Sequence, residues 1–297
     1  MAGWEVSVTE ESDGEHVPAI RPPRFYDELG EEEWERLDAG PKARLEFENT
    51  LAYLEDHLPQ TGHVLDIGGA AGRYAVWLAE RGYTVTLADV SRGQLEIARE
   101  KLTDRGLDEY VHVHAGDLRA LPYPTATFDA VCCLGGPLSH VVDPEDRDRA
   151  AAELRRAARS TAPVFVSVMG FIAVLQRLVQ AAPEFEQGVT QLPLLLETQT
   201  YDASLLDRAG VEDPTFVACH FFRAAELRTL LEDHGLVVEA LVGLEGIASN
   251  FESALEGASP GAVSMIEQVV RDQAVREDPT VADISNHILA VAYPADR

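Results

Sequence analysis

Residues His63–Ser91 read HVLDIGGAAGRYAVWLAERGYTVTLADVS, a pattern that predicts a strand, a turn, a helix and a second strand. The mostly apolar run at 64–67 is too short for a helix and ends at glycine. Apolar residues then recur at helical spacing in Arg73–Arg81 until Gly82 stops the helix, and Tyr83–Ala88 is rich in β-forming residues. Such a βαβ unit is parallel and right-handed, so both strands end at one edge of a sheet, where ligands bind.

The turn between the first strand and the helix consists of small residues: Gly68, Gly69, Ala70, Ala71 and Gly72. Small side chains let a ligand approach the main chain and leave the N–H groups of the helix free for an anion. Asp89 ends the second strand about 20 residues after the first glycine, where an acid can accept hydrogen bonds from both hydroxyls of a ribose. The alternative is a tight connection that binds no ligand.

The run VLDIGGAAG at 64–72 resembles the first motif of the class I S-adenosylmethionine-dependent methyltransferases, hydrophobic-hydrophobic-Asp-x-Gly-x-Gly-x-Gly. Ala70 replaces the middle glycine of that motif and adds a methyl group near the expected cofactor path. A nicotinamide-binding domain is the alternative, but its Gly-x-Gly-x-x-Gly fingerprint is not matched by Gly68, Ala70 and Arg73. The resemblance implies an α/β fold with a doubly wound, seven-stranded, mostly parallel sheet that binds S-adenosylmethionine.

A second stretch, Gly116-Asp117-Leu118, follows a predicted strand at 111–115 and resembles the segment that contacts adenine in this family. The resemblance implies that the Asp117 carboxylate accepts a hydrogen bond from the adenine amino group. It also implies that the backbone N–H of Leu118 contacts the adenine ring. The alternative is that Asp117 caps a helix or forms a turn. The resemblance thus assigns cofactor binding to the following residues: Asp66, Gly68, Gly69, Ala70, Gly72, Asp89, Val90, Asp117, Leu118 and Leu134.

His140 lies in the loop after the fourth predicted strand, which in the resembled family faces the transferred methyl group. Methyl transfer from a sulfonium mainly requires alignment and desolvation of the acceptor, so no fixed triad is needed. His140 is the histidine expected at this edge with a pKa suited to removing a proton from an OH or NH acceptor, and we assign it as the catalytic residue. Alternatively, it caps the helix that starts after Asp143 or binds a backbone carbonyl.

The remaining pattern predicts a mobile acidic tail at 1–20 and one methyltransferase domain at 21–297. The domain comprises an N-terminal arm at 21–57, a core at about 58–169 and 223–297, a cap insertion at 170–222 and a helical insertion at 250–280. Pro22 and Pro23 predict an extended entry, and Tyr26 and Trp34 either pack the arm or face the cofactor. Further strands are predicted at 128–134, 164–168, 237–242 and 287–292, and further helices at 43–57, 91–106, 144–158, 171–179 and 224–234. The second insertion is expected to be helical over 251–276.

The composition restricts the surroundings of the protein. The formal charge is −27, the acids are spread along the chain, and Lys42 and Lys101 are the two lysines. Such a chain repels nucleic acid and anionic membranes, and its surface is suited to high salt; the alternative is an acidic partner-binding face. No apolar run approaches the ~18 residues of a membrane span, so we expect a soluble, cytoplasmic protein. The three cysteines include no Cys-x-x-Cys pair, which favours buried thiols and no metal site.

These observations predict a transferase that moves a methyl group from S-adenosylmethionine to a small organic molecule. The insertions are apolar, and no basic, aromatic-rich patch for RNA is found. We expect a monomer or homodimer. The acceptor atom stays open between oxygen, nitrogen, carbon and sulfur. Two other functions stay open as well: a methyltransferase-like binding or regulatory protein without turnover, and an NAD(P)-dependent oxidoreductase.

Overall fold

The computed structural model describes residues 22–183, 186–210, 216–276 and 278–296. The predicted acidic tail at 1–20 lies outside these ranges. Within them, no helix is both long and apolar enough to cross a lipid bilayer.

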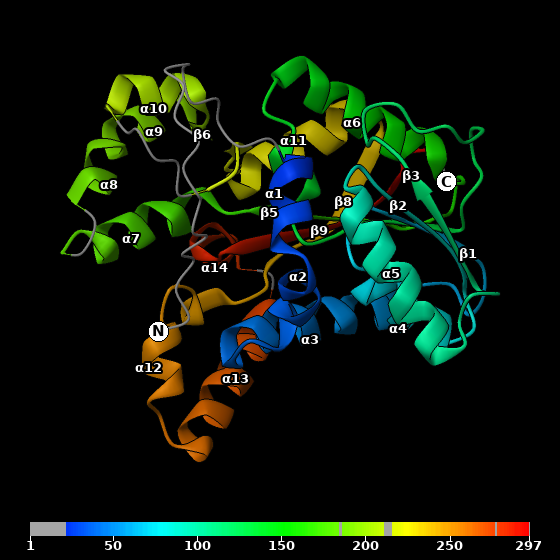
Figure 1. Ribbon diagram of the computed structural model, residues 1–297, viewed down its shortest axis with the longest axis horizontal. Coiled ribbons are helices and arrows are strands. Elements are labelled where there is room, and N and C mark those ends of the chain that lie inside the picture. Colours follow the sequence, from blue (N-terminus) through cyan, green and yellow to red (C-terminus); the bar gives the residue numbers. More distant parts are fainter. Residues whose placement is uncertain (1–21, 184–185, 211–215, 277, 297) are drawn as a thin grey trace.

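Among the described residues, the core is a seven-stranded sheet in the order β3-β2-β1-β4-β5-β9-β8 (Figure 1). Strands β1 to β5 are parallel, whereas β9 runs antiparallel to both β5 and β8. The prediction of a seven-stranded, mostly parallel sheet is confirmed. The strands are β1 His63–Ile67, β2 Thr84–Asp89, β3 Val111–Ala115, β4 Ala130–Cys133, β5 Val164–Met169, β8 Leu236–Gly243 and β9 His287–Pro294.

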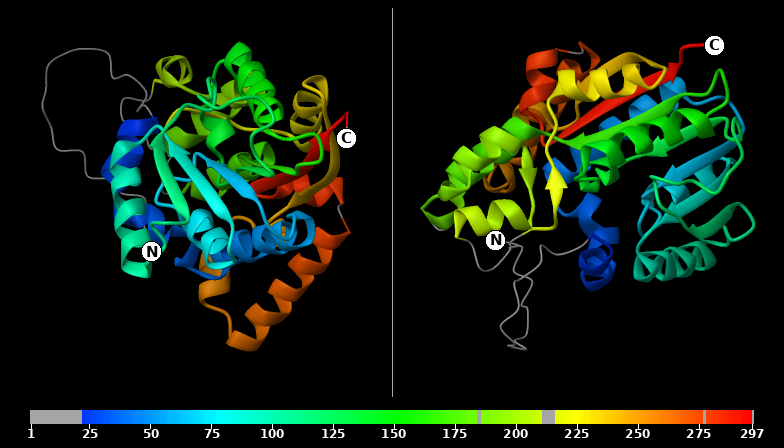
Figure 2. Two further views of the ribbon diagram at one scale, coloured as in Figure 1. Left: turned by 90° about the vertical axis from the view of Figure 1, so that its right-hand side faces the viewer. Right: turned by 90° about the horizontal axis from the view of Figure 1, so that it is seen from above.

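Helices cover both faces of the sheet (Figure 2). One layer holds α3 Pro41–His57, α4 Arg73–Glu80 and α5 Arg92–Arg105; the other holds α6 Pro144–Ala157, α11 Ala224–Asp233 and α14 Pro279–Ile284. Successive strand residues alternate between the layers, so Leu65 packs with the α6 layer and Val64 with the α4 layer. The same alternation directs Asp66 toward α4.

The N-terminal arm consists of α1 Pro22–Leu29, α2 Glu31–Glu35 and η1 Arg36–Asp38. The prediction of an extended entry at Pro22 and Pro23 is wrong, because both prolines begin α1. The first N–H groups of a helix have no partner within it, so proline loses nothing there. Figures 1 and 2 show α1 between α5 and the helices of the cap insertion. Asp27 fixes α1 to α5 by accepting hydrogen bonds from the Ser91 hydroxyl at 2.5 Å and the Gly93 N–H at 2.9 Å.

The cap insertion follows the carboxyl end of β5 and stands to one side of the sheet (Figure 1). Its elements are α7 Phe171–Ala181, α8 Glu186–Thr190, α9 Leu192–Thr198, β6 Thr200–Tyr201, α10 Ala203–Ala209 and β7 Cys219–His220. Phe171, Leu195 and Phe221 belong to an apolar core of its own. Helical insertions at the active-site edge were expected, and the cap confirms them.

The second insertion is helical, as expected for this stretch. It consists of two helices, α12 Glu252–Glu256 and α13 Pro260–Val275, after the short turn η3 Gly246–Ala248. Ser259 caps α13 by accepting a hydrogen bond from the Ala262 N–H, and Pro260 occupies the first helical position, which favours a new start over continuation. Val270 on α13 packs with Leu45 on α3.

All three cysteines are buried free thiols, as predicted.

Candidate functional site

A cleft with an internal volume of about 100 Å³ lies at the carboxyl edge of the sheet, between the neighbouring strands β1 and β4, where the strand order reverses. This is the switch point at which open α/β sheets bind ligands. Turn and strand-end residues form one wall: Gly68, Gly69, Ala70, Ala71, Asp89, Val90 and Leu134. Arm residues form the opposite wall: Pro22, Tyr26, Glu33, Arg36 and Leu37. The volume is small for a cofactor pocket because the arm packs over the cleft.

The glycine turn is fixed by close packing on its neighbours. A Cβ atom on Gly68 would lie 2.3 Å from the Pro137 Cγ atom, and one on Gly69 would lie 2.5 Å from the Asp66 carboxylate. Gly68 also has a φ of +75°, in the left-handed region that favours glycine. Ala70 adopts the same region with a φ of +44°, which is costly for a residue with a Cβ atom.

Asp89 is held at the end of β2 by two backbone groups. One carboxylate oxygen accepts the Ala70 N–H at 2.9 Å and the other accepts the Ser91 N–H at 2.8 Å. Burial raises the pKa of Asp89, and these N–H groups counteract that rise. Each carboxylate oxygen can accept more than one hydrogen bond, so Asp89 keeps capacity for the hydroxyls of a ribose.

Four of the predicted cofactor residues lie outside the cleft lining: Asp66, Gly72, Asp117 and Leu118. Asp66 is buried beneath the turn, and neither carboxylate oxygen makes a hydrogen bond of ordinary geometry with the described residues. Burial and the nearby Asp89 charge raise the pKa of Asp66 to about 7.

Gly72 precedes α4 as its N-cap, with a φ of +86°, and Leu118 belongs to the apolar core. Asp117 points to Arg119, whose guanidinium donates hydrogen bonds to both carboxylate oxygens at 2.6–3.1 Å and lowers the pKa of Asp117. The Gly116 N–H donates to the Asp89 carbonyl at 3.0 Å, so this segment lies beside the strand end that carries Asp89. Its assignment to adenine stays a prediction.

His140 closes the turn η2 Pro137–His140 and lines the cleft. Its Nε2 atom lies 2.9 Å from the Tyr26 hydroxyl, and its Nδ1 atom lies 3.1 Å from the Ala218 carbonyl oxygen. The carbonyl contact agrees with one of the two structural alternatives. The other is absent, because Asp143 itself caps α6 by accepting the Asp146 N–H. Burial lowers the pKa of His140 to about 4, so the imidazole is neutral near pH 7. It is then a weaker base than the unperturbed histidine on which the sequence-based assignment rested.

Glu33 and Arg36 are cleft residues that the sequence did not identify, whereas Tyr26, left open between packing the arm and facing the cofactor, also lines the cleft. The Arg36 guanidinium donates to the carboxylates of Glu33 at 3.1 Å and Glu46 at 2.7 Å. An arginine at the end of the acid-rich run at 31–35 was the available signal, but the run carries no motif. Trp34 does not line the cleft; instead its ring packs against the Arg73 guanidinium, 4.9 Å from the ring centre.

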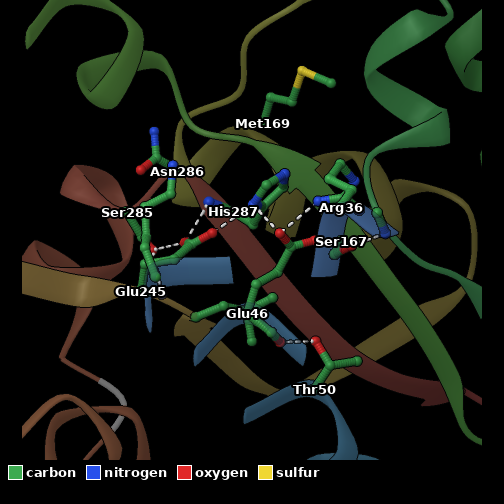
Figure 3. Close-up of polar contacts among 12 residues, drawn as sticks. Arg36, Glu46, Thr50, Ser167, Met169, Glu245, Ser285, Asn286 and His287 are labelled. Atoms are coloured by element: carbon green, nitrogen blue, oxygen red, sulfur yellow. Dashed lines mark hydrogen bonds and ion pairs between the residues drawn. The ribbon is translucent and has the colours of Figure 1, made fainter. Parts of the chain in front are cut away.

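A buried network of charges stands behind Arg36 (Figure 3). The imidazole of His287 lies 2.6 Å from the Glu245 carboxylate and 3.5 Å from the Glu46 carboxylate. Burial alone would lower the pKa of His287, but the charges of Glu46 and Glu245 outweigh it and raise that pKa. Ser285 donates a further hydrogen bond to Glu245 at 2.7 Å.

Glu46, Glu245 and His287 are also the described residues whose ligand atoms lie within 4.8 Å of one another, close enough for a metal ion. The Arg36 guanidinium lies 2.7 Å from Glu46 and the His287 imidazole 2.6 Å from Glu245, so the geometry favours a network of ion pairs and hydrogen bonds without a metal ion. The prediction of no metal site stays a prediction.

The cleft fits the functional groups of S-adenosylmethionine. Asp89 suits the ribose hydroxyls, and the small turn residues allow close approach of the main chain. The amino-acid part of the cofactor carries one positive and one negative charge, and Glu33 and Arg36 offer the complementary charges on the arm.

Comparison with known proteins finds methyltransferases among the relatives of this chain. Residues 64–161 match the family described as the methyltransferase domain. The chain is 31% identical to methyltransferase GfsG of Streptomyces halstedii over 51% of the chain and 53% of the relative. It is 32% identical to the ubiquinone biosynthesis O-methyltransferase of Azoarcus sp. over 65% of the chain and 72% of the relative. The match to GfsG and to several other curated relatives spans about half of their length or less.

Solved structures support the fold. A structure described as an S-adenosylmethionine-dependent methyltransferase of Methanosarcina mazei superimposes with a TM-score of 0.55 and 18% identity, covering 82% of this chain and 96% of that one. The [4+2]-cyclase SpnF also has a TM-score of 0.55, with 16% identity, covering 94% and 99%. Because the Azoarcus relative is matched over most of its length, the chain belongs to the class I S-adenosylmethionine-dependent methyltransferase family.

Proposed function

We propose that the protein transfers a methyl group from S-adenosylmethionine to a small organic acceptor. The observation that carries the proposal is Asp89 at the cleft between β1 and β4, with each carboxylate oxygen oriented by a backbone N–H group. Family membership and the glycine turn support it. A nicotinamide-binding sheet ordinarily continues with parallel strands, whereas β9 is antiparallel here, which speaks against the oxidoreductase alternative.

The chemistry follows from the placement of the two walls. The cofactor, when bound, supplies a methyl group on a sulfonium, which is already activated for in-line displacement. Asp89 on the strand-end wall would hold the ribose of the cofactor, and Glu33 and Arg36 on the arm wall would hold its charged amino-acid end. His140 stays neutral above about pH 4, so its Nε2 lone pair can accept the hydrogen bond or the proton of an O–H or N–H acceptor.

Calorimetry with S-adenosylmethionine and S-adenosylhomocysteine, followed by an acceptor screen, tests this function. Binding of both ligands and methylation of a small molecule would establish it. Binding without transfer to any acceptor would favour the regulatory alternative, and the likeness to the [4+2]-cyclase is a reason to run the complete screen. A response to reduced nicotinamide alone would favour an oxidoreductase.

The surroundings are part of the proposal. We infer a cytoplasmic monomer or homodimer that binds neither nucleic acid nor membranes, because the formal charge of −27 repels polyanions. We also infer a surface adapted to high salt. At ~1 M salt the Debye length is roughly 3 Å, so acid–acid repulsion is screened and the thermal midpoint rises with KCl. A midpoint that is flat or falls from low to molar KCl would contradict this adaptation.

A further inference from the structure

His140 is the point at which the arm, the loop after β4 and the cap meet. The Ala218 carbonyl, next to β7 in the cap, can only accept a hydrogen bond, so the His140 Nδ1 atom at 3.1 Å carries the proton. The Nε2 atom therefore presents its lone pair. The Tyr26 hydroxyl from α1 lies 2.9 Å away and donates to it.

The backbone that carries Tyr26 is fixed, and its ring packs against two neighbouring rings. Gln94 on α5 donates its side-chain N–H groups to the carbonyls of Tyr26 at 2.7 Å and Gly30 at 2.9 Å, which fixes the backbone of α1. The Tyr26 ring meets the rings of Phe25 and His140 edge to face, with centres 5.3 Å and 5.5 Å apart. Tyr26 and His140 both line the cleft.

We propose that Tyr26 is a positioning residue whose hydroxyl occupies the place of the methyl acceptor on His140, so that an acceptor reaches Nε2 only in exchange for Tyr26. The identity of the acceptor rests on the proposed function, whereas the exchange concerns only the pair Tyr26–His140. One ring nitrogen offers one in-plane lone pair, so two donors cannot both use it.

The exchange has a consequence for specificity. An acceptor with an O–H or N–H group restores the hydrogen bond that His140 loses when Tyr26 withdraws. An acceptor without a donor leaves both His140 and the Tyr26 hydroxyl unpaired in a partly buried site, which is unfavourable. The pair therefore selects hydroxyl- and amine-bearing acceptors against carbon and thioether acceptors.

The exposure of the Nε2 lone pair can be measured without any acceptor. Diethylpyrocarbonate modifies neutral imidazole nitrogens, and mass spectrometry of the peptides gives a rate for each histidine. In Tyr26→Phe the hydroxyl is lost but the ring packing is kept. We expect His140 to react about 5-fold faster in this variant, because one neutral hydrogen bond is worth roughly 1 kcal/mol. The exposed His112 on β3 serves as the internal reference.

Tyr83→Phe is the matched control, because the Tyr83 hydroxyl donates to the Pro59 carbonyl at 2.6 Å, away from the cleft lining. It should leave the rate at His140 unchanged. Phenol then tests whether an added hydroxyl can take the position that the Tyr26 hydroxyl occupies on His140 Nε2. It should slow modification of His140 in Tyr26→Phe and have a much weaker effect in the wild-type protein. A circular-dichroism melt checks that the variants fold.

Equal rates at His140 in the wild-type protein and Tyr26→Phe would overturn the proposal, as would equal protection of both proteins by phenol. Calorimetry with S-adenosylhomocysteine on the same preparations separates the two proposals. Absence of binding would reject the methyltransferase function and leave the measured exchange intact, whereas binding with equal modification rates would reject the exchange alone.

Discussion

The two walls of the cleft are built in different ways. The strand-end wall comes from one continuous βαβ unit, and its Asp89 is held by the backbone N–H groups of Ala70 and Ser91. The arm wall comes from α1 to η1, and its Arg36 is held by the side-chain carboxylates of Glu33 and Glu46. Backbone N–H groups do not titrate and cannot be mutated away, whereas the support of Arg36 is made entirely of ionisable side chains.

This difference predicts that pH and substitution act mainly on the arm wall. Glu46 lies between Arg36 and His287, and His287 in turn lies beside Glu245 (Figure 3). Removing one member therefore leaves buried charges without partners. The strand-end wall should change only when Asp89 itself or its turn is altered.

The largest effect is expected from His287→Gln. Glu245 is fully buried, so losing the positive charge beside it should destabilise the fold by about 3–5 kcal/mol, the range for breaking a buried ion pair. Chemical denaturation at pH 6 measures this difference. His234→Gln is the control, because the contacts of the His234 ring with the described residues are to the Leu230 carbonyl and an exposed Asp148, and a change of roughly 0.5 kcal/mol or less is expected.

The effect of His287→Gln should depend on pH with a defined sign. The pKa of His287 is raised in the folded state above its unfolded value of about 6.5. The stabilisation is therefore complete below about pH 6.5 and is lost as pH rises through the folded-state pKa. The difference between the wild-type protein and the variant should shrink at alkaline pH. A difference that grows with pH would show that His287 is neutral in the folded protein.

At the acceptor end, His140→Ala should reduce turnover about 10²-fold or more and change cofactor affinity only a few-fold, because general base catalysis is typically worth 10²- to 10⁴-fold. His114→Ala, on the exposed side of β3, is the matched control. With the pKa of His140 lowered to about 4 by burial, the wild-type rate should not fall near pH 6.5 on acidification. Nearly full turnover in the variant would show that His140 has a structural role and is not the catalytic residue.

At the cofactor end, Asp89→Ala should weaken binding of S-adenosylhomocysteine by ~1.5–3 kcal/mol, the range for losing a charged hydrogen-bond partner. Asp89→Asn keeps one carbonyl oxygen and should lose less. Calorimetry measures both variants, and Asp108→Ala, an exposed acid outside the cleft lining, should bind normally. An unchanged dissociation constant in folded Asp89→Ala would remove Asp89 from the site.

The strand-end wall could be predicted from sequence because its information is local. Periodicity, the glycines and the acid after β2 lie within one stretch, and parallel strands necessarily end at one edge. Seven of the eleven predicted site residues line the cleft: Gly68, Gly69, Ala70, Asp89, Val90, Leu134 and His140.

The arm wall could not be predicted because its partners are far apart in sequence. Tyr26 reaches His140 across 114 positions, and no short motif records such a contact. Asp117 was assigned to adenine from the family resemblance. In the structure its carboxylate instead accepts a hydrogen bond from Arg119, two residues away. The helix at Pro22 was missed because two prolines favour extended structure unless they stand at a helix start.

The smallest effect concerns the one departure from the glycine motif. Ala70 has a φ of +44°, and an L-residue in the left-handed region costs roughly 1–2 kcal/mol. Ala70→Gly removes this strain but adds about 0.5–1 kcal/mol of backbone entropy lost on folding. A net stabilisation of roughly 0.5–1 kcal/mol is expected, with the hydrogen bond from residue 70 to Asp89 kept. Ala71→Gly, at a neighbouring position without a positive φ, should destabilise instead. If the Ala70 backbone is strained, the thermal midpoint should rise in Ala70→Gly and fall in Ala71→Gly. A lower midpoint in both variants would show that it is not strained.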